Sequence, residues 1–169
     1  HETVSAEELG GASSHTKKSG VADLAFDDDI TVLEQTRRLL DFLPLSNKEK
    51  APSRLTEDPR DRKSFNLDTL IPDNSNSPYD MKELILTIID EEDFFEIQPD
   101  YAQNIIIGFA RISGETIGIV ANQPMVLAGC LDIDSSRKAA RFVRFCDCFN
   151  IPIVTLVDVP GFLPGTSQE

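Results

Sequence analysis

The pattern of hydrophobic and polar positions predicts alternating strands and helices in the second half of the chain. After Pro78, apolar residues recur at intervals of three and four, which is typical of an amphipathic helix. The apolar positions of this helix are Met81, Leu84, Ile85 and Ile88. Two apolar runs, residues 105–111 and 116–121, then flank Ser113 and Gly114, and this arrangement predicts two strands joined by a tight hairpin.

A second helix is predicted to begin at residues 132–135, and Pro152 follows its end. Its inward face is expected to consist of Ala139, Phe142, Val143, Cys146 and Phe149. The next segment, residues 153–165 (IVTLVDVPGFLPG), starts with an almost uninterrupted apolar run, which predicts a strand covered on both faces. The order strand, strand, helix, strand predicts an α/β fold, in which ligands bind beyond the carboxyl ends of strands.

The first 44 residues are typical of the end of an α/β unit. Ser5 and Glu8 form the pattern of a capping box for a short helix over residues 4–9. A strand is predicted over residues 21–26, and a helix is predicted to start at residues 27–29 and to end at Pro44. The face of that helix expected to pack inward is Ile30, Leu33, Leu40 and Leu43.

Hydrophobic periodicity disappears between residues 45 and 77, where Pro, Asn and Ser interrupt a charged segment. More than about 30 residues without an element is uncommon inside a compact domain. The predicted organisation is therefore the end of one domain (1–44), a linker (45–77) and the first part of a second domain (78–169).

Composition and charge exclude several classes of function. The 169 residues are 40% hydrophobic and 27% charged, which is typical of a globular protein, and no apolar run approaches the roughly 18 residues of a membrane span. The formal net charge of −13 argues against a nucleic-acid partner. Cys130, Cys146 and Cys148 suggest neither a disulfide framework nor a CxxC site, so a reducing compartment is expected.

Two loops are the main candidates for a binding or catalytic site. The loop over residues 121–129 (ANQPMVLAG) leads to a helix start, where free amides favour an anion or a developing negative oxygen. Asn122 and Gln123 supply its side-chain donors; the alternative is an ordinary crossover loop. The turn PGFLPG is interpreted either as an oxyanion hole, with Phe162 and Leu163 keeping water away, or as a rigid corner.

Other polar groups are weaker candidates. A basic helix face is either a phosphate or coenzyme A contact or a solvated face; it contains Arg137, Lys138, Arg141 and Arg144. Asp132 and Asp134 are more typical of a helix cap than of a metal site, and no metal is expected. His15 is isolated, and GxSxG and P-loop motifs are absent, so any chemistry must rely on a cofactor or on backbone amides.

The chain resembles the carboxyltransferase β subunits of biotin-dependent acyl-CoA carboxylases. The resemblance rests on EELGGASSHTKKSGVADLAFDDD near the start and on ANQPMVLAGCLDIDSSRKAARFVRFCDCFNIPIVTLVDVPGFLPGTSQE at the end. It runs through essentially the whole chain and is weakest at residues 45–77. FFEIQPDYAQNIIIGFARI, the NQP loop and DVPGFLPG fit the branch of the family that carboxylates propionyl-CoA.

This resemblance implies a crotonase-like fold, a β/β/α superhelix, in each domain. It also implies transfer of a carboxyl group from carboxybiotin to the α carbon of propionyl-CoA, with two oxyanion holes of backbone amides and no side-chain base. The implied catalytic candidates are Gly161, Phe162, Leu163, Pro164, Gly165 and Thr166. The implied candidates for the acyl-CoA or biotin pocket, within the region between Ile97 and Cys130, are Asn122, Gln123, Met125, Ala128 and Gly129.

The resemblance further implies partners and a location. Biotin would be carried by an α subunit with biotin carboxylase and biotin-carrier parts, which would use ATP and Mg²⁺, while the β subunits would form a β6 core of an α6β6 assembly. The location would be the mitochondrial matrix in a eukaryote and the cytoplasm in a bacterium. Because the second oxyanion donor is expected beyond Glu169, residues 1–169 alone are expected to be inactive. Two alternatives remain open: another short acyl-CoA substrate (acetyl-, butyryl- or methylcrotonyl-CoA) and a non-catalytic assembly subunit.

Overall fold

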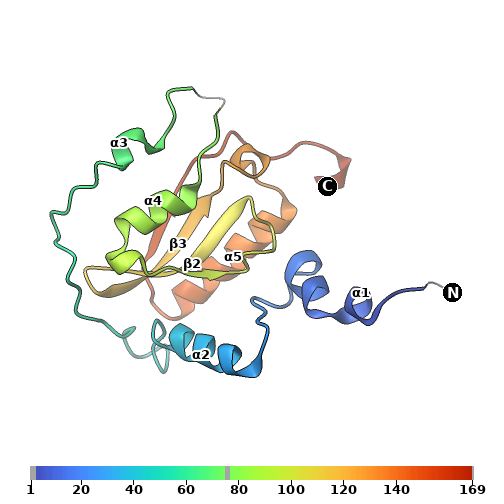
Figure 1. Ribbon diagram of the computed structural model, residues 1–169, viewed down its shortest axis with the longest axis horizontal. Coiled ribbons are helices and arrows are strands. Elements are labelled where there is room, and N and C mark those ends of the chain that lie inside the picture. The colour runs from blue at the N-terminus through green and yellow to red at the C-terminus, as the bar shows by residue number, and fades with distance from the viewer. Residues whose placement is uncertain (1–2, 75–76, 169) are drawn as a thin grey trace.

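The centre of the molecule is a four-stranded sheet with helices on both faces (Figure 1). The computed structural model describes residues 3–74 and 77–168. The strands lie in the order β1-β2-β3-β4. They are β1 (Phe95–Ile97), β2 (Ile105–Ile112), β3 (Glu115–Asn122) and β4 (Ile153–Leu156). The first three are antiparallel neighbours, and β4 pairs parallel to β3.

The predicted hairpin between β2 and β3 is confirmed. Ser113 and Gly114 both have positive φ values, 53° and 80°, as a two-residue turn between twisted strands requires. The buried carboxylate of Asp90 accepts hydrogen bonds from both turn amides, at 3.1 and 2.7 Å. This turn fixes the register, with Ile112 opposite Glu115.

The helices α4 (Met81–Ile88) and α5 (Ile133–Cys148) cover opposite faces of the sheet, because alternate residues of β2 belong to two separate hydrophobic clusters. Both helices were predicted from the sequence. Phe142 and Cys146 of α5 are buried as expected, but Val143 is exposed, because it lies at the edge of the face that contacts the sheet. Gly118 of β3 lets α5 approach: a Cβ there would lie 2.7 Å from Sγ of Cys146.

The strand predicted at Ile153 is confirmed, but its two-sided burial is not seen in the described residues. Ile153, Val154 and Leu156 are half-buried and Thr155 is exposed, since β4 is an edge strand. Its pairing with β3 ends where Leu156 lies opposite Ala121. The chain therefore leaves the sheet two residues before Asp158.

The first 44 residues contain the two predicted helices but not the predicted strand. The short helix α1 (Ala6–Gly10) has the capping box of Ser5 and Glu8, and α2 (Asp29–Leu40) is capped by Asp28. A π-helical turn, Ser14–Lys18, follows α1. Residues 21–26 form no strand: among the described residues, their one backbone hydrogen bond to the sheet region is from Gln98 N to Asp23 O (3.1 Å). Their other contacts are made by side chains, with Leu24 packed against the core and Asp23 paired with Arg141.

The predicted inward face of α2 is wrong within the helix, whereas Leu43, predicted on the same face, follows the helix and packs half-buried against the core. Ile30 and Leu33 are 70% and 64% exposed, and Leu40 is exposed as well. The helix meets the sheet only at its carboxyl end, where Phe42 is fully buried and stacks under the guanidinium of Arg111 at 4.1 Å. Figure 1 shows α2 below the sheet, with the segment that follows it running up the side of the molecule towards α3.

Residues 45–77 contain one short helix, α3 (Leu67–Leu70), and otherwise no regular element in their described part. The segment nevertheless contacts the sheet body along its first half. Arg54 N donates to Gly114 O (2.9 Å), and the Arg62 guanidinium donates to two carbonyls at the end of α4. None of the described helices is both long and apolar enough to cross a membrane.

Candidate active site

The carboxyl ends of β3 and β4 bring together the two loops that the sequence indicated separately. Beyond the paired residues Ala121 and Leu156, the loops meet again at Leu131 and Phe162, which form a parallel bridge. Leu131 N donates to Gly161 O (3.0 Å), and Leu163 N donates to Leu131 O (2.8 Å). The loop at residues 122–131 and the turn at residues 158–165 therefore form one continuous surface at the end of the sheet where α/β proteins bind ligands.

Asn122 joins the two loops from the inside. Its buried side chain donates from Nδ2 to Gly129 O (3.2 Å), and its Oδ1 accepts from Asp158 N (3.2 Å). The loops pack so closely that a Cβ at Gly129, whose φ is +76°, would lie 2.5 Å from Asp158 O. The predicted ligand donor Asn122 thus serves as a brace between the loops.

Gln123 connects the first loop to the start of α4. Its Nε2 donates to Oδ1 of Asp80 (2.7 Å), and its Oε1 accepts from the amides of Met81 (3.2 Å) and Met125 (3.4 Å). On the other loop, the Tyr79 hydroxyl donates to Oδ2 of Asp158 (2.7 Å). Burial, with the neighbouring Asp158 carboxylate, raises the pKa of Tyr79 to about 12. Both predicted side-chain donors, Asn122 and Gln123, are thus hydrogen-bonded within the protein.

The start of α5 is occupied by groups of the chain itself. Oδ1 of Asp132 accepts from Ser135 N (2.8 Å), and Oε1 of Gln168 accepts from Ile133 N (3.1 Å). Burial pushes the pKa of Asp132 upward, but hydrogen bonds from Ser135 and Asn104 outweigh burial and lower it. The carboxylate of Asp132 therefore takes the position that the sequence suggested for a bound anion.

Backbone amides with no acceptor among the described residues occur in both loops, and two of these places are candidate oxyanion donors. One is formed by Leu127 and Ala128, which have left-handed φ values of 52° and 53°, a conformation that non-glycine residues rarely adopt and that is enriched at functional sites. The other is formed by Gly161 and Phe162. Apolar side chains beside these amides are exposed, including Met125 (59%) and Phe162 (52%). Such amides are suited to stabilising a negative oxygen.

The remaining candidates of the turn differ in whether their backbone amide is free to donate a hydrogen bond. The amide of Leu163 is already bonded to Leu131, and Pro164 has no N–H, so neither is a free donor. The amides of Gly165 and Thr166 donate to no described residue, and Gly165 O accepts from Gln168 N (2.9 Å). The free amide of Leu127 was missed by sequence reasoning, because a backbone donor has no side-chain signature.

The four basic residues of α5 line one cavity of about 250 Å³ beside Ser19, and no residue of the two candidate loops lines it. Two of the four already have partners: Lys138 is buried and donates only to backbone carbonyls, and Arg141 pairs with Asp23 (2.9 Å). Among the described residues, no group of three or more His, Cys, Asp or Glu side chains is arranged to hold a metal ion.

Comparison with known proteins places the chain in a family. The sequence model of the carboxyl transferase domain matches residues 1–169. The chain is 72% identical to the propionyl-CoA carboxylase beta chain of Cereibacter sphaeroides, over all of this chain and 33% of the relative. It is 60% identical to the mitochondrial propionyl-CoA carboxylase beta chain of Sus scrofa, over all of this chain and 31% of that relative. The chain thus spans about a third of the length of the curated relatives it matches.

A solved structure of transcarboxylase 12S, described as a hexamer assembly with methylmalonyl-coenzyme A and methylmalonic acid bound, has the same fold. It superposes with a TM-score of 0.95 at 45% identity, over 99% of this chain and 32% of that one. The fold is crotonase-like, as the sequence resemblance implied. With its whole length matched by one family, this chain belongs to the carboxyl transferase domain family.

Proposed function

We propose that this chain is part of a carboxyltransferase subunit that transfers a carboxyl group from carboxybiotin to the α carbon of propionyl-CoA, giving methylmalonyl-CoA. The observation that carries the proposal is the pair of free amide sites, at Leu127–Ala128 and Gly161–Phe162, on two loops that are joined at Leu131. The high identity to propionyl-CoA carboxylase beta chains supports this substrate over other short acyl-CoA thioesters.

The residues at the site fit a biotin ureido group or a thioester. The space beside Gly161 is open, since a Cβ built there would meet no heavy atom within 4 Å, and the Phe162 ring offers an apolar surface. When bound, carboxybiotin supplies the activated carboxyl group. The chain would hold such a group with backbone N–H donors, which need no ionisable side chain.

The amides are proposed to stabilise the negative oxygen that develops on the thioester when its α proton is lost. Fixed N–H groups lower the energy of such an oxygen without reorganising and have no proton to lose near neutral pH. Polar side chains of the loops are committed elsewhere: Asn122 and Gln123 brace the backbone, and Asp158 accepts from Tyr79. This arrangement supports stabilisation of the oxygen by backbone amides. The α proton would be accepted by the biotin ureido group once the carboxyl group has left it, because an amide N–H cannot accept a proton.

The proposed partners follow from the same assignment. A biotin-bearing α subunit with biotin carboxylase activity would use ATP and Mg²⁺, and the β subunits would assemble as a β6 core; the hexameric transcarboxylase 12S supports the core. The relatives include bacterial and mitochondrial chains, so the proposed location is the cytoplasm of a bacterium or the mitochondrial matrix of a eukaryote. The proposed domain organisation remains 1–44, 45–77 and 78–169.

The test is carboxylation by the full-length subunit assembled with its α subunit, using labelled bicarbonate and a panel of acetyl-, propionyl-, butyryl- and methylcrotonyl-CoA. We expect the highest kcat/KM with propionyl-CoA and labelled methylmalonyl-CoA as the product. Preference for another thioester would overturn the substrate assignment. An assembled subunit that carboxylates none of the four thioesters and also fails to exchange label between methylmalonyl-CoA and biotin would instead be a non-catalytic assembly component.

A further inference from the structure

Lys138 is a buried lysine whose ammonium group is enclosed by backbone carbonyls. Only 2% of the residue is exposed. Its Nζ donates to the carbonyl oxygens of Gln98 (2.8 Å), Tyr101 (2.7 Å), Ala102 (3.3 Å) and Ile105 (2.8 Å). A buried charge is costly unless it is fully hydrogen-bonded, and here acceptors outnumber the three N–H donors of the ammonium. We call these four carbonyls the carbonyl cage.

The backbone that forms the carbonyl cage adopts conformations that a free segment would avoid. Gln98 and Ala102 have positive φ values of 53° and 42°, although neither is glycine. Such residues persist only where surrounding contacts hold them. Burial lowers the pKa of Lys138 to about 8, with Glu96 acting in the opposite direction, so most of the lysine still carries its charge at neutral pH.

Asn104, inside the segment that Lys138 holds, fastens both ends of the loop that carries the Leu127 and Ala128 amides. Asn104 O accepts from Gln123 N (3.0 Å) at the start of that loop. Asn104 Nδ2 donates to Cys130 O (2.8 Å) at its end. The hydrogen-bonded path from Lys138 through residues 98–105 thus reaches the backbone on both sides of the candidate oxyanion donors.

We propose that Lys138 is a positioning residue: its ammonium orders residues 98–105, and Asn104 transmits that order to the loop bearing the free amides of Leu127 and Ala128. The inference rests on the proposed function, because it assigns the catalytic consequence of Lys138 to the carboxyl-transfer site. It explains why a lysine occupies a buried position on a helix face otherwise facing the sheet. Lys138 itself does not touch substrate.

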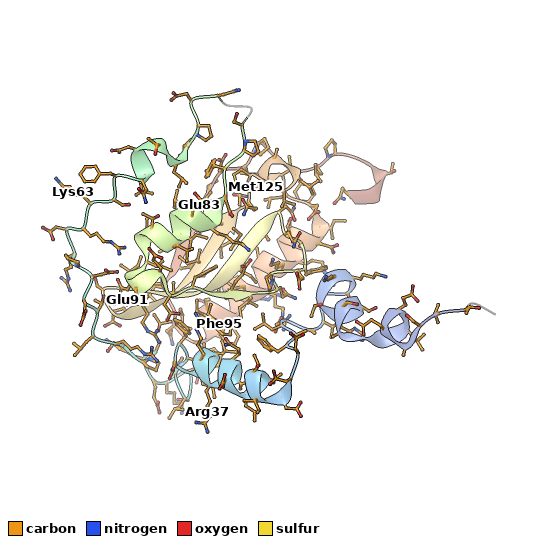
Figure 2. The ribbon with its side chains drawn as sticks, viewed as in Figure 1. Arg37, Lys63, Glu83, Glu91, Phe95 and Met125 are labelled. Carbon is orange, nitrogen blue, oxygen red and sulfur yellow. The ribbon has the colours of Figure 1, made fainter. Side chains whose placement is uncertain are left out.

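The test uses the full-length subunit in its holoenzyme, with the variants Lys138→Met and Lys138→Ala. Hydrogen exchange at the Gly129 and Cys130 amides, which bond within the loop, should quicken at least about tenfold because that loop opens locally. A displacement of catalytic groups by about 1 Å lowers the reaction rate by up to about a hundredfold. We therefore expect kcat to fall about tenfold to a hundredfold, with KM nearly unchanged. The matched control is Lys63→Met, on the exposed segment that Figure 2 shows far from α5. It should change neither the hydrogen exchange of the loop nor kcat.

Chemical rescue of Lys138→Ala distinguishes the effect of the ammonium charge from the effect of the lost packing. In Lys138→Ala, n-propylammonium supplies the missing carbons and charge, and a cavity lined by Lys138 gives access to the carbonyl cage. It should restore exchange protection and kcat, whereas n-propanol should not. Equal rescue by both compounds, or unchanged exchange and kcat in the variants, would overturn the proposal.

A second variant covers the case in which Lys138 variants do not fold. Asn104→Ala leaves the carbonyl cage and the backbone bond from Gln123 N to the carbonyl of residue 104 intact, and it removes the side-chain bond to Cys130 O. The kcat should therefore fall, and a normal kcat would overturn the proposal. Hydrogen exchange and n-propylammonium rescue do not depend on turnover. They therefore decide the role of Lys138 even if the wild-type holoenzyme proves not to carboxylate propionyl-CoA.

Discussion

Replacing Asn122 with alanine should separate the two loops of the candidate site without touching a free amide. The side chain makes one hydrogen bond to each loop: Nδ2 to Gly129 O and Oδ1 from Asp158 N, both 3.2 Å. Alanine removes both bonds. If Asn122 instead contacted a ligand, the same substitution would weaken binding and leave the loops in place.

The magnitude follows from the surroundings of each bonded partner. Asp158 is exposed, so its amide can bond to water, and its bond is worth about 1 kcal/mol. Gly129 is buried, so its carbonyl loses its bond and stays without a partner, at a further cost of about 2 kcal/mol. The expected loss of local stability is therefore about 3 kcal/mol, or about a hundredfold in the opening equilibrium.

The assay is amide hydrogen exchange in the full-length subunit, observed at Leu131 and Leu163, whose N–H groups bond across the two loops. Both should exchange about a hundredfold faster in Asn122→Ala, and kcat should fall more than KM rises. Asn66→Ala is the matched control, since Asn66 precedes α3 without a capping hydrogen bond from its side chain. Unchanged exchange together with a raised KM would refute the bracing role.

Three further predictions concern the surroundings of the site. Gly129→Ala puts a Cβ at φ +76° and 2.5 Å from Asp158 O, so the midpoint of denaturant unfolding should fall by the equivalent of about 2 kcal/mol or more; an unchanged midpoint would contradict the close approach of the loops. Gly118→Ala should destabilise by about 1–3 kcal/mol through overpacking against Sγ of Cys146, and adding Cys146→Ala should recover part of this loss; strict additivity in the double-mutant cycle would argue against the contact. The pKa of Tyr79 is raised to about 12, so its contribution to stability is fully present below pH 10 and is lost as the pH rises towards about 12. The free energy of unfolding should therefore fall less steeply with pH between these values in Tyr79→Phe than in the wild type. Equal slopes would contradict the raised pKa.

Elements set by local sequence were predictable. The hairpin at Ser113 and Gly114 needs only two residues that tolerate positive φ between two apolar runs. The start of α5 at Asp132 is likewise a local capping pattern, and its reciprocal hydrogen bonds with Ser135 are present. These features depend on neighbours in sequence, so the sequence contains the information that determines them.

Features that depend on distant contacts were not predictable. The apolar spacing located α2 but chose the wrong face, because the burial of Phe42 is decided by Arg111 and by β1, which are far along the chain. The three-residue strand β1 was missed, since its pairing with Phe109 on β2 stabilises a segment too short to show a pattern. A segment such as residues 21–26, which is apolar enough for a strand, lacks a partner strand in the described structure.

The candidate site was predictable in outline only. Pro-Gly pairs and the strand end indicated the turn, and Gly129 lies where the loops approach each other closely. The sequence could not show that the amide of Leu163 is bonded to Leu131, or that Asn122 and Gln123 face inward. Which backbone amides remain free depends on the register between loops about 30 residues apart.

The central claim, that backbone amides stabilise the reacting oxygen, is tested most directly by removing one N–H group. Phenyllactic acid incorporated at Phe162 of the full-length subunit changes the amide to an ester and leaves the side chain intact. The same replacement at exposed Phe65, whose amide donates to no described residue, is the control. We predict that kcat for carboxylation of propionyl-CoA falls about 10²–10³-fold for the Phe162 ester and stays unchanged for the Phe65 ester. A Phe162 ester enzyme with the kcat of the native backbone would contradict the account.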